Sequence, residues 1–368
     1  MPTAVAPILS IGKRFERRFR RLVLARLAGA ASHQEQLELA RVHRVLLIRA
    51  NFRLGNLVLA LPALPALRAV LPDAPLDVLC GRGFATLLDG HPDVDTVLTV
   101  DRRSLTHPLH LWRLARRLRA ARYDLVVDGG RGSSFLGAML ARLSGGRWRA
   151  ANAGCRYEAC FNVLAPHSHR RHKLDLLLDM LDGLGIPPAE HAPRLHLRPD
   201  EMARAAAALD AWGTGPRPLV GISMAGRSEK GFPHAQIAAL ANQLVGAGSS
   251  VVVFPGPEEQ HRAAALRPQL RREVRVAPLL PIREFAAVIA LLDVFVTADS
   301  GPMHVAAAVG TRVVTAVRSL TAPYFVPRGP RHRAVLPDPA HPVADLAAAI
   351  AELLAAEPPA AVQPPTAV

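Results

Sequence analysis

The segment Val294–Val317, with the sequence VFVTADSGPMHVAAAVGTRVVTAV, combines residue types that can hold an anionic ligand. An apolar strand is predicted over Val294–Thr297, followed by a polar turn, a helix of small residues and a second apolar strand. Ser300 suits an N-cap and Pro302 suits a first helical turn, so backbone N–H groups should point out of this turn. At the carboxyl end of a parallel strand, such a turn is a favourable seat for phosphate.

Two side chains beside this turn add chemistry. Asp299 can accept hydrogen bonds from a hydroxyl group, and His304 lies one turn into the predicted helix, where it can donate to a phosphate oxygen. A capping role for Asp299 and a packing role for His304 are the structural alternatives. The combination predicts a site for a sugar nucleotide or another phosphorylated ligand.

Other catalytic and cofactor motifs are missing from the sequence. Neither G-x-G-x-x-G, nor G-x-x-x-x-G-K-[ST], nor G-x-S-x-G occurs, which disfavours a standard dinucleotide site, a P-loop and a serine hydrolase elbow. The three cysteines, Cys80, Cys155 and Cys160, form no C-x-x-C pair and lack a fourth zinc ligand at a suitable spacing. We therefore expect a reducing, cytoplasmic setting, no metal and no cofactor.

The 368-residue chain carries a formal net charge of +15, mostly from arginine. This charge indicates an acidic partner, although a coding bias toward Arg, Ala and Pro explains it equally well. Aromatic residues make up 5% of the chain, so platforms for base stacking are scarce and nucleic acid is not the expected partner.

Residues 1–40 are predicted to form a basic, amphipathic extension. Apolar residues recur there at helical spacing beside a cluster of cations: Ile8, Ile11, Phe15, Phe19 and Leu22 with Lys13, Arg14, Arg17, Arg18, Arg20, Arg21 and Arg26. Such a helix can lie on an anionic membrane surface, or it can pack on its own domain. No apolar run long enough to span a bilayer and no signal peptide are recognised.

From Arg44 onward, apolar strands alternate with helices, which predicts an α/β fold with parallel sheets. We predict domains at 41–190 and 218–355, a linker at 191–217 that contains a helix near Arg198–Trp212, and a disordered tail at 356–368. Long helices are expected at Asn56–Leu71 and Leu109–Ala121. The strands are expected in RVLLIRA, LDVLCG, VDTVLTVD and YDLVVDGG, and then in PLVGISMAG, SSVVVFPG, VFVTADSG and RVVTAV.

Three segments resemble glycosyltransferase family 9, the heptosyltransferases of lipopolysaccharide core assembly. They are RVLLIRANFRLGNLVLALPALPALRAVLPDAPLDVLCG, YDLVVDGGRGSS and LPIREFAAVIALLDVFVTADSGPMHVAAAVGTRVVTAV, and the likeness covers about 44–326. The resemblance implies a GT-B fold, in which two Rossmann-like domains face a central cleft. It places the acceptor in the first domain and the nucleotide sugar in the second.

By this resemblance, the donor-binding residues come from three loops of the second domain: Ser223, Arg227 and Lys230, then Glu259, then Asp299, Ser300, Gly301, Pro302 and His304. Lys and Arg suit phosphate, and an ionised Glu can accept from both hydroxyls of a ribose. Glu258 is the rival of Glu259. A solvated loop and a carboxylate at a helix start are the structural alternatives.

The first domain departs from the family pattern. Many members have Gly-Asp in the loop after the first strand, where the Asp is the proposed base, whereas this chain has Gly55-Asn56. A neutral amide can orient a hydroxyl but cannot take its proton. Asp128 and Asp101 are possible substitutes, although an acid that ends a strand often only caps the next helix. Arg53 and Arg131 are candidates for binding acidic groups of the acceptor.

The resemblance therefore implies an inverting, metal-independent transferase at the inner face of the cytoplasmic membrane. Its donor would be ADP-heptose or a similar nucleoside diphosphate sugar, and its acceptor a lipopolysaccharide core or another lipid-linked glycan. Because of Asn56, a nucleotide-sugar-binding protein with weak or lost catalysis is the alternative.

Overall fold

The computed structural model describes residues 34–101, 107–168, 172–188, 192–226, 232–318 and 324–356. The chain divides into two compact units, with the boundary between Pro193 and Arg194. The predicted basic extension, apart from its last residues, and the predicted tail after residue 356 lie outside the described residues, as do Arg227 and Lys230.

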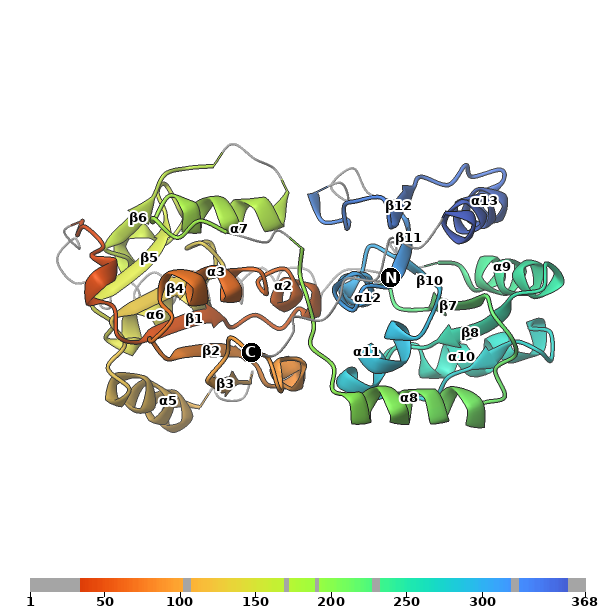
Figure 1. Ribbon diagram of the computed structural model, residues 1–368, viewed down its shortest axis with the longest axis horizontal. Helices are drawn as coiled ribbons and strands as arrows, with labels where there is room; N and C mark the ends of the chain where they lie inside the picture. Colours follow the sequence, from red (N-terminus) through yellow and green to blue (C-terminus); the bar gives the residue numbers. More distant parts are fainter. Residues whose placement is uncertain are drawn as a thin grey trace, which may run out of the picture. The chain divides into compact units, whose positions relative to one another are not determined.

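The N-terminal unit is built on a six-stranded sheet in the order β3-β2-β1-β4-β5-β6 (Figure 1). All neighbouring strands are parallel. The strands are β1 (Val45–Arg49), β2 (Leu76–Gly81), β3 (Thr96–Val100), β4 (Leu125–Asp128), β5 (Trp148–Asn152) and β6 (Val163–Ala165). The sequence predicts the first four of these strands and misses β5 and β6, which are polar or very short.

Its helices are η1 (Leu39–Arg41), α2 (Leu54–Val58), α3 (Ala63–Val70), η2 (Arg82–Leu88), α5 (Pro108–Ala120), α6 (Phe135–Ser144), η3 (Glu158–Cys160) and α7 (Lys173–Asp182). The expected helix Leu109–Ala121 is confirmed as α5, one residue earlier at each end. The expected single helix Asn56–Leu71 is wrong, since α2 and α3 are separated by a turn. Pro62 explains the break because it has no N–H to donate to the carbonyl of Val58.

The C-terminal unit repeats the same plan, with its sheet in the order β12-β11-β10-β7-β8-β9. These strands are also parallel throughout. They are β7 (Leu219–Ser223), β8 (Ser250–Phe254), β9 (Arg275–Val276), β10 (Val294–Ala298), β11 (Arg312–Ala316) and β12 (His332–Val335). The expected α/β class with two Rossmann-like sheets is confirmed, whereas a cleft between the two units stays a prediction.

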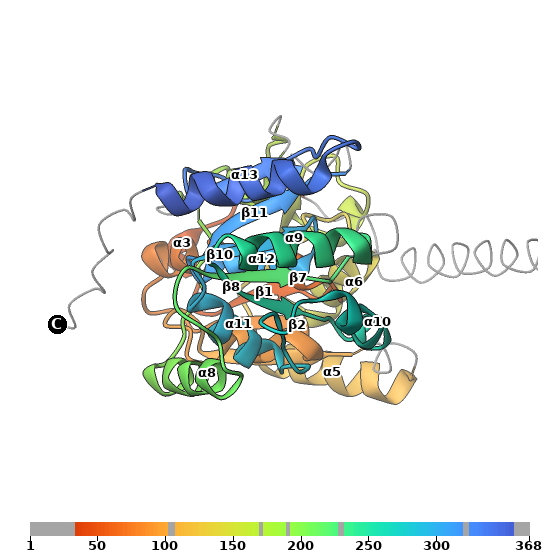
Figure 2. The same cartoon turned by 90° about the vertical axis from the view of Figure 1, so that its right-hand side faces the viewer.

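The helices of this unit are α8 (Pro199–Ala211), α9 (His234–Gly246), α10 (Gln260–Leu266), η4 (Arg267–Gln269), α11 (Ile282–Ala290), α12 (Gly301–Ala308) and α13 (Pro342–Ala355). Helices α9 and α13 pack on one face of the sheet, and α8, α11 and α12 pack on the other (Figure 2). Strand β10 serves both faces, because Val294 and Val296 point into one core and Phe295 points into the other.

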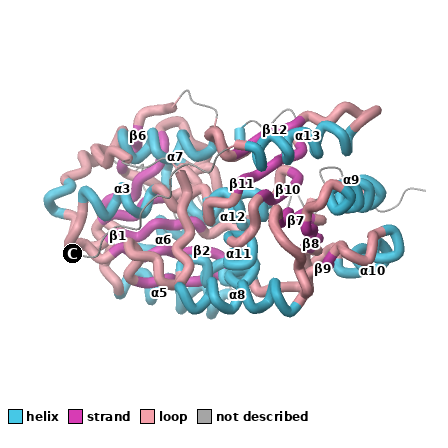
Figure 3. The backbone as a smooth tube through the Cα atoms, turned by 45° about the vertical axis from the view of Figure 1, so that its right-hand side comes forward, coloured by secondary structure: helices cyan, strands magenta, loops and turns pink. Residues whose placement is uncertain are grey.

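Helix α8 lies within the range that the sequence assigns to a linker. Its buried Glu201 forms an ion pair with Arg283 of α11, with 2.8 Å between Nη2 and Oε2. This helix therefore packs as part of the C-terminal unit. Figure 3 shows the strands of each sheet in magenta, with helices and loops around them. Among the described residues, no helix combines the length and the apolar character that crossing a bilayer requires.

Candidate functional site

Both sheets have a position where the direction of strand order reverses. It lies between β1 and β4 in the N-terminal unit and between β7 and β10 in the C-terminal unit. In open parallel sheets, ligands bind outside the carboxyl ends of the strands that flank such a position, because the loops there diverge. The candidate residues follow β1 and β4 in one unit, and β7, β8 and β10 in the other.

The turn after β10 leads directly into α12. Gly301 is the first helical residue and Pro302 lies in the first turn, as the sequence predicts. Ser300 occupies the N-cap position with extended backbone, but its side chain makes no capping hydrogen bond. Its Oγ instead lies 3.0 Å from Oγ1 of the buried Thr297. The expected side-chain cap is therefore absent, because the hydroxyl of Ser300 hydrogen-bonds to the hydroxyl of Thr297 in the preceding strand instead.

His304 is buried in α12, together with most of the helix's apolar residues. The imidazole therefore lies on the buried side of α12. Its expected contact with phosphate stays a prediction. Asp299 immediately precedes the N-cap residue, at the carboxyl edge of the sheet. This is where an anion would experience the positive end of the α12 dipole.

Ser223 ends β7, the central strand next to β10. It is buried, and its Oγ accepts a hydrogen bond from the N–H of Ala225 at 3.1 Å. This bond shapes the start of the loop that carries the two predicted phosphate-binding cations. Those cations, Arg227 and Lys230, lie outside the described residues, so their roles stay predictions.

Glu259 lies after β8, at the start of α10, and is buried, whereas Glu258 is exposed. Its carboxylate accepts a hydrogen bond from the N–H of Gly226 and lies directly over Gly256, where a Cβ atom would be 2.4 Å from Oε2. Burial, aided by the negative charge of Glu258, raises the pKa of Glu259. Glu259 thus joins the loops after β7 and β8, which favours it over Glu258 as the carboxylate of the site.

In the N-terminal unit, Asp128 is the buried last residue of β4. Its Oδ1 accepts from the N–H of Gly130 at 2.9 Å, and its Oδ2 accepts from that of Gly132 at 2.7 Å. Burial raises the pKa of Asp128, and these two hydrogen bonds oppose the rise. At Gly137 of α6, a Cβ atom would come within 2.6 Å of Oδ1, so the absence of a side chain there makes room for the carboxylate.

Arg49 ends β1 and connects this carboxylate to the loop that contains Asn56. Its Nε donates to the backbone carbonyl of Asn56 at 2.7 Å. Burial lowers the pKa of Arg49 to about 10, while the charge of Asp128 opposes the shift. Sequence reasoning overlooks Arg49. A cation that ends an otherwise apolar strand is the signal that could have revealed it.

Arg131 adopts a left-handed backbone conformation, with φ of 58°. Burial lowers its pKa, and the charge of Asp128 acts against this. The pKa of Lys173, the first residue of α7, is also lowered, by burial and then by the charge of Arg131. The fold therefore brings Arg131 close to Lys173, a second cation that the sequence does not single out.

The other candidates in this unit lie in more open surroundings. Arg53 is exposed at the N-cap of α2, while Gly55 and Asn56 are half-buried in its first turn. Asp101 forms an ion pair with Arg82, with 3.3 Å between the carboxylate and Nε. Arg49 is therefore hydrogen-bonded to the loop of Asn56 and feels the charge of Asp128, whereas Asp101 pairs with a different cation.

Within the described ranges, no group of three or more His, Cys, Asp or Glu side chains is arranged to hold a metal ion. Asp93 and Asp95 have the spacing of an Asp-x-Asp motif, but Asp95 is committed elsewhere. It accepts from Arg68 at 2.6 Å and from the N–H of Leu76 at 2.7 Å. This pairing lowers the pKa of Asp95, chiefly through the backbone hydrogen bond.

Solved structures with the same architecture define the class of fold. A glycosyl transferase family 9 protein from Veillonella parvula superposes with a TM-score of 0.72 at 20% identity, covering 82% of this chain and 87% of that one. The E. coli heptosyltransferase WaaC with ADP superposes with a TM-score of 0.68 at 21% identity, covering 84% and 98%. Two parallel α/β units of this kind form a GT-B fold.

Sequence comparison narrows the class to a family. The model of the family described as "Glycosyltransferase family 9 (heptosyltransferase)" matches residues 111–341 of this chain. Lipopolysaccharide heptosyltransferase 3 of Escherichia coli is 24% identical over 273 residues, covering 71% of this chain and 79% of the relative. Lipopolysaccharide heptosyltransferase 1 of Pseudomonas aeruginosa is 28% identical over 282 residues, covering 72% and 76%. The chain belongs to glycosyltransferase family 9, which confirms the resemblance and makes it a glycosyltransferase.

Proposed function

We propose that this protein transfers a heptose-like sugar, with inversion and without a metal ion, from ADP-heptose to a lipopolysaccharide core or another lipid-linked glycan. One observation carries the proposal. Three adjacent strands, β8, β7 and β10, bring Glu259, Ser223 and the Asp299 turn to one edge of one sheet. The solved WaaC structures contain ADP and ADP-2-deoxy-2-fluoro heptose, and the curated relatives are lipopolysaccharide heptosyltransferases, which supports the choice of donor and acceptor.

The donor half of the reaction requires stabilisation of a departing diphosphate. Negative charge develops on that leaving group as the glycosidic bond forms to the acceptor. The N-terminus of α12 and the cations Arg227 and Lys230 would face this charge without needing a metal. Glu259 would accept hydrogen bonds from the ribose hydroxyls, and Asp299 from a hydroxyl of the donor. Ser223 and His304 would complete the binding of the phosphates.

In the acceptor half, Gly55 and Asn56 would orient the attacking hydroxyl, and Arg53 and Arg131 would bind acidic groups of the acceptor. Asp128 is the expected substitute base, but both of its oxygens hold loop N–H groups and the carboxylate is buried. We therefore assign Asp128 to positioning the loop. The proton of the hydroxyl would then leave through water.

The first test concerns the donor site. Asp299→Ala and Lys230→Ala should each lower kcat/KM with ADP-heptose by roughly ten- to a hundredfold, since each removes a hydrogen bond to a charged group. Steady-state kinetics on the full chain, with calorimetric measurement of ADP affinity, provide the readout. Exposed residues of the same charge, Asp210→Ala and Arg272→Ala, serve as controls. Unchanged kinetics in both site variants would refute the assignment of the donor site.

A second candidate function is a nucleotide-sugar-binding protein with lost or weak turnover, and Asn56 favours it. Under our proposal, the wild-type chain transfers sugar and Asn56→Asp changes kcat by less than about tenfold. If a base is missing, restoring the carboxylate should instead raise kcat by about a hundredfold or more. Single-turnover transfer assays on both proteins separate the two functions.

The proposal also covers the location of the protein and its contact with the membrane. We infer that the protein works on the cytoplasmic side of the inner membrane, where the basic residues of segment 1–40 would attract anionic lipid. That segment lies largely outside the described residues. The support is the charge pattern in the sequence together with the names of the curated relatives.

A further inference from the structure

Among the residues that the structure describes, large apolar side chains are rarely exposed. Within the described part of the chain, four stand out, and two of them, Leu109 and Trp112, lie one turn apart on α5. The side chains are 44% and 55% exposed, respectively. A single exposed apolar residue needs no explanation, whereas two adjacent ones form a small apolar surface.

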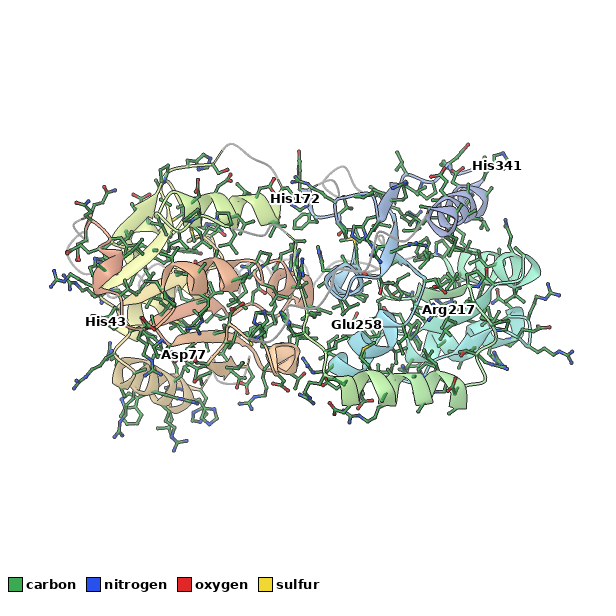
Figure 4. All side chains as sticks on the ribbon, viewed as in Figure 1. His43, Asp77, His172, Arg217, Glu258 and His341 are labelled. Atoms are coloured by element: carbon green, nitrogen blue, oxygen red, sulfur yellow. The ribbon has the colours of Figure 1, made fainter. Side chains whose placement is uncertain are left out.

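Helix α5 has a clear inner and outer face. Ala115 and Leu118 are buried, and Leu118 packs into the core that includes strands of the sheet. Leu109, Trp112 and Arg116 recur at spacings of three and four residues on the opposite side, where they share one outward stripe. Figure 4 shows several long side chains with nitrogen ends projecting from this helix, away from the body of the unit.

The outward stripe is strongly basic. Arg113, Arg116, Arg117 and Arg119 are all exposed, and no acidic residue occurs between His107 and Arg122. Within the described residues, none of these four guanidinium groups takes part in an ion pair. The carbon of the Arg116 guanidinium lies 5.5 Å from the centre of the Trp112 ring.

Local helix chemistry explains only part of this charge. Arg117 and Arg119 lie in the last turn, where cations interact favourably with the helix dipole. Arg113 and Arg116 lie in the middle of the helix beside the exposed apolar residues and gain nothing from its end. Their exposed position leaves both guanidinium groups accessible to a partner outside the protein.

We propose that the outer face of α5, formed by Leu109, Trp112, Arg113 and Arg116, docks on the surface of an anionic lipid bilayer. The two apolar side chains would enter the headgroup region, where tryptophan is favoured, while the guanidinium groups pair with lipid phosphates. Charge complementarity selects this occupant, and the exposed indole favours a lipid interface over a purely ionic partner. The proposal extends beyond the reaction and does not depend on residues 1–40.

The main test measures binding of the full chain to vesicles. We compare phosphatidylcholine alone with phosphatidylcholine containing phosphatidylglycerol, in the absence of donor and acceptor. Arg113→Glu with Arg116→Glu should lower the affinity for the anionic vesicles at least tenfold. The matched control is Arg271→Glu with Arg272→Glu, the same change in charge at exposed positions of the C-terminal unit, and should have a much smaller effect. Circular dichroism verifies that both variants fold.

Tryptophan fluorescence provides an independent measurement. Of the three tryptophans, Trp148 is buried and Trp212 is half-buried in the C-terminal unit, so Trp112 is the indole whose surroundings should change most on docking. Anionic vesicles should shift the emission to shorter wavelength, and Trp112→Phe should abolish the shift. An unshifted spectrum, or equal losses in the α5 variant and its control, would overturn the proposal. Retention on a nucleic-acid column is measured for the same proteins. The proposal would also be overturned if Arg113→Glu with Arg116→Glu reduced this retention but left the affinity for vesicles unchanged. Because no sugar transfer is measured, failure here leaves the proposed reaction untouched.

Discussion

Replacement of Asp128 by alanine should destabilise the N-terminal unit by about 3–5 kcal/mol, the range for removing one member of a buried charged group. Two backbone N–H groups, those of Gly130 and Gly132, would lose their acceptor inside the protein. Arg49 would at the same time lose the negative charge that offsets its burial. Urea unfolding followed by circular dichroism measures the loss directly.

Two comparisons make this result specific. Asp128→Asn keeps an oxygen acceptor for one N–H group and should cost less than the alanine variant. Asp73→Ala, at an exposed position, should remain within about 0.5 kcal/mol of wild type, as expected for a surface change. If Asp128→Ala were as stable as Asp73→Ala, the carboxylate would not be organising the loop.

Loss of the buried ion pair between α8 and α11 should have a similarly large effect. The side chains of Arg283 and Glu201 are 9% and 7% exposed. Arg283 donates to both carboxylate oxygens and also to the carbonyl of His196 at 2.8 Å. Arg283→Met should therefore cost about 3 kcal/mol, the lower end of the range for a broken buried pair, since the buried carboxylate keeps its contacts with the side chain and the N–H of Arg198. Denaturant unfolding of the C-terminal unit measures this, and the double variant Arg283→Met with Glu201→Leu should recover much of the loss.

This ion pair should also impose a pH dependence on stability. The hydrogen bond from Arg283 holds the pKa of Glu201 below its ordinary value of 4.5. The stabilisation is therefore complete above the unfolded pKa and is lost as the pH falls through the lower, folded value. Below about pH 4.5, wild type should lose stability more steeply than the double variant. Parallel slopes for the two proteins would contradict the coupling.

Much of the fold could be predicted from the sequence because its central strands are apolar runs. Buried parallel strands such as β10 read as continuous hydrophobic segments, and the N-cap and proline signals mark the start of α12. The missed strands β5, β6, β9 and β12 carry arginine or are short, so their pattern is too weak to recognise. Pro62 shows the opposite case, a local signal that was present and outweighed by helical periodicity.

The positions of candidate residues could be predicted where they share a local motif, but not where they depend on contacts between distant segments. Asp299 and Pro302 lie in one short segment, so the sequence alone predicts that both lie at the start of α12. The role of Arg49 emerges only because its side chain donates to the carbonyl of Asn56 while the charge of Asp128 acts on it, and this arrangement depends on the pairing of β1 with β4. The choice between Glu258 and Glu259 depends on the exact start of α10, which no propensity determines to one residue.

Each of the hydrophobic clusters described for this protein draws its side chains from a single unit. Damage to one half can therefore leave the scaffold of the other intact. Under the proposed function, a chain with a damaged N-terminal unit would still bind nucleotide and would compete with intact enzyme for the donor. The proposal therefore makes loss of turnover and loss of nucleotide binding separable traits, and mutations in the two units would have different consequences.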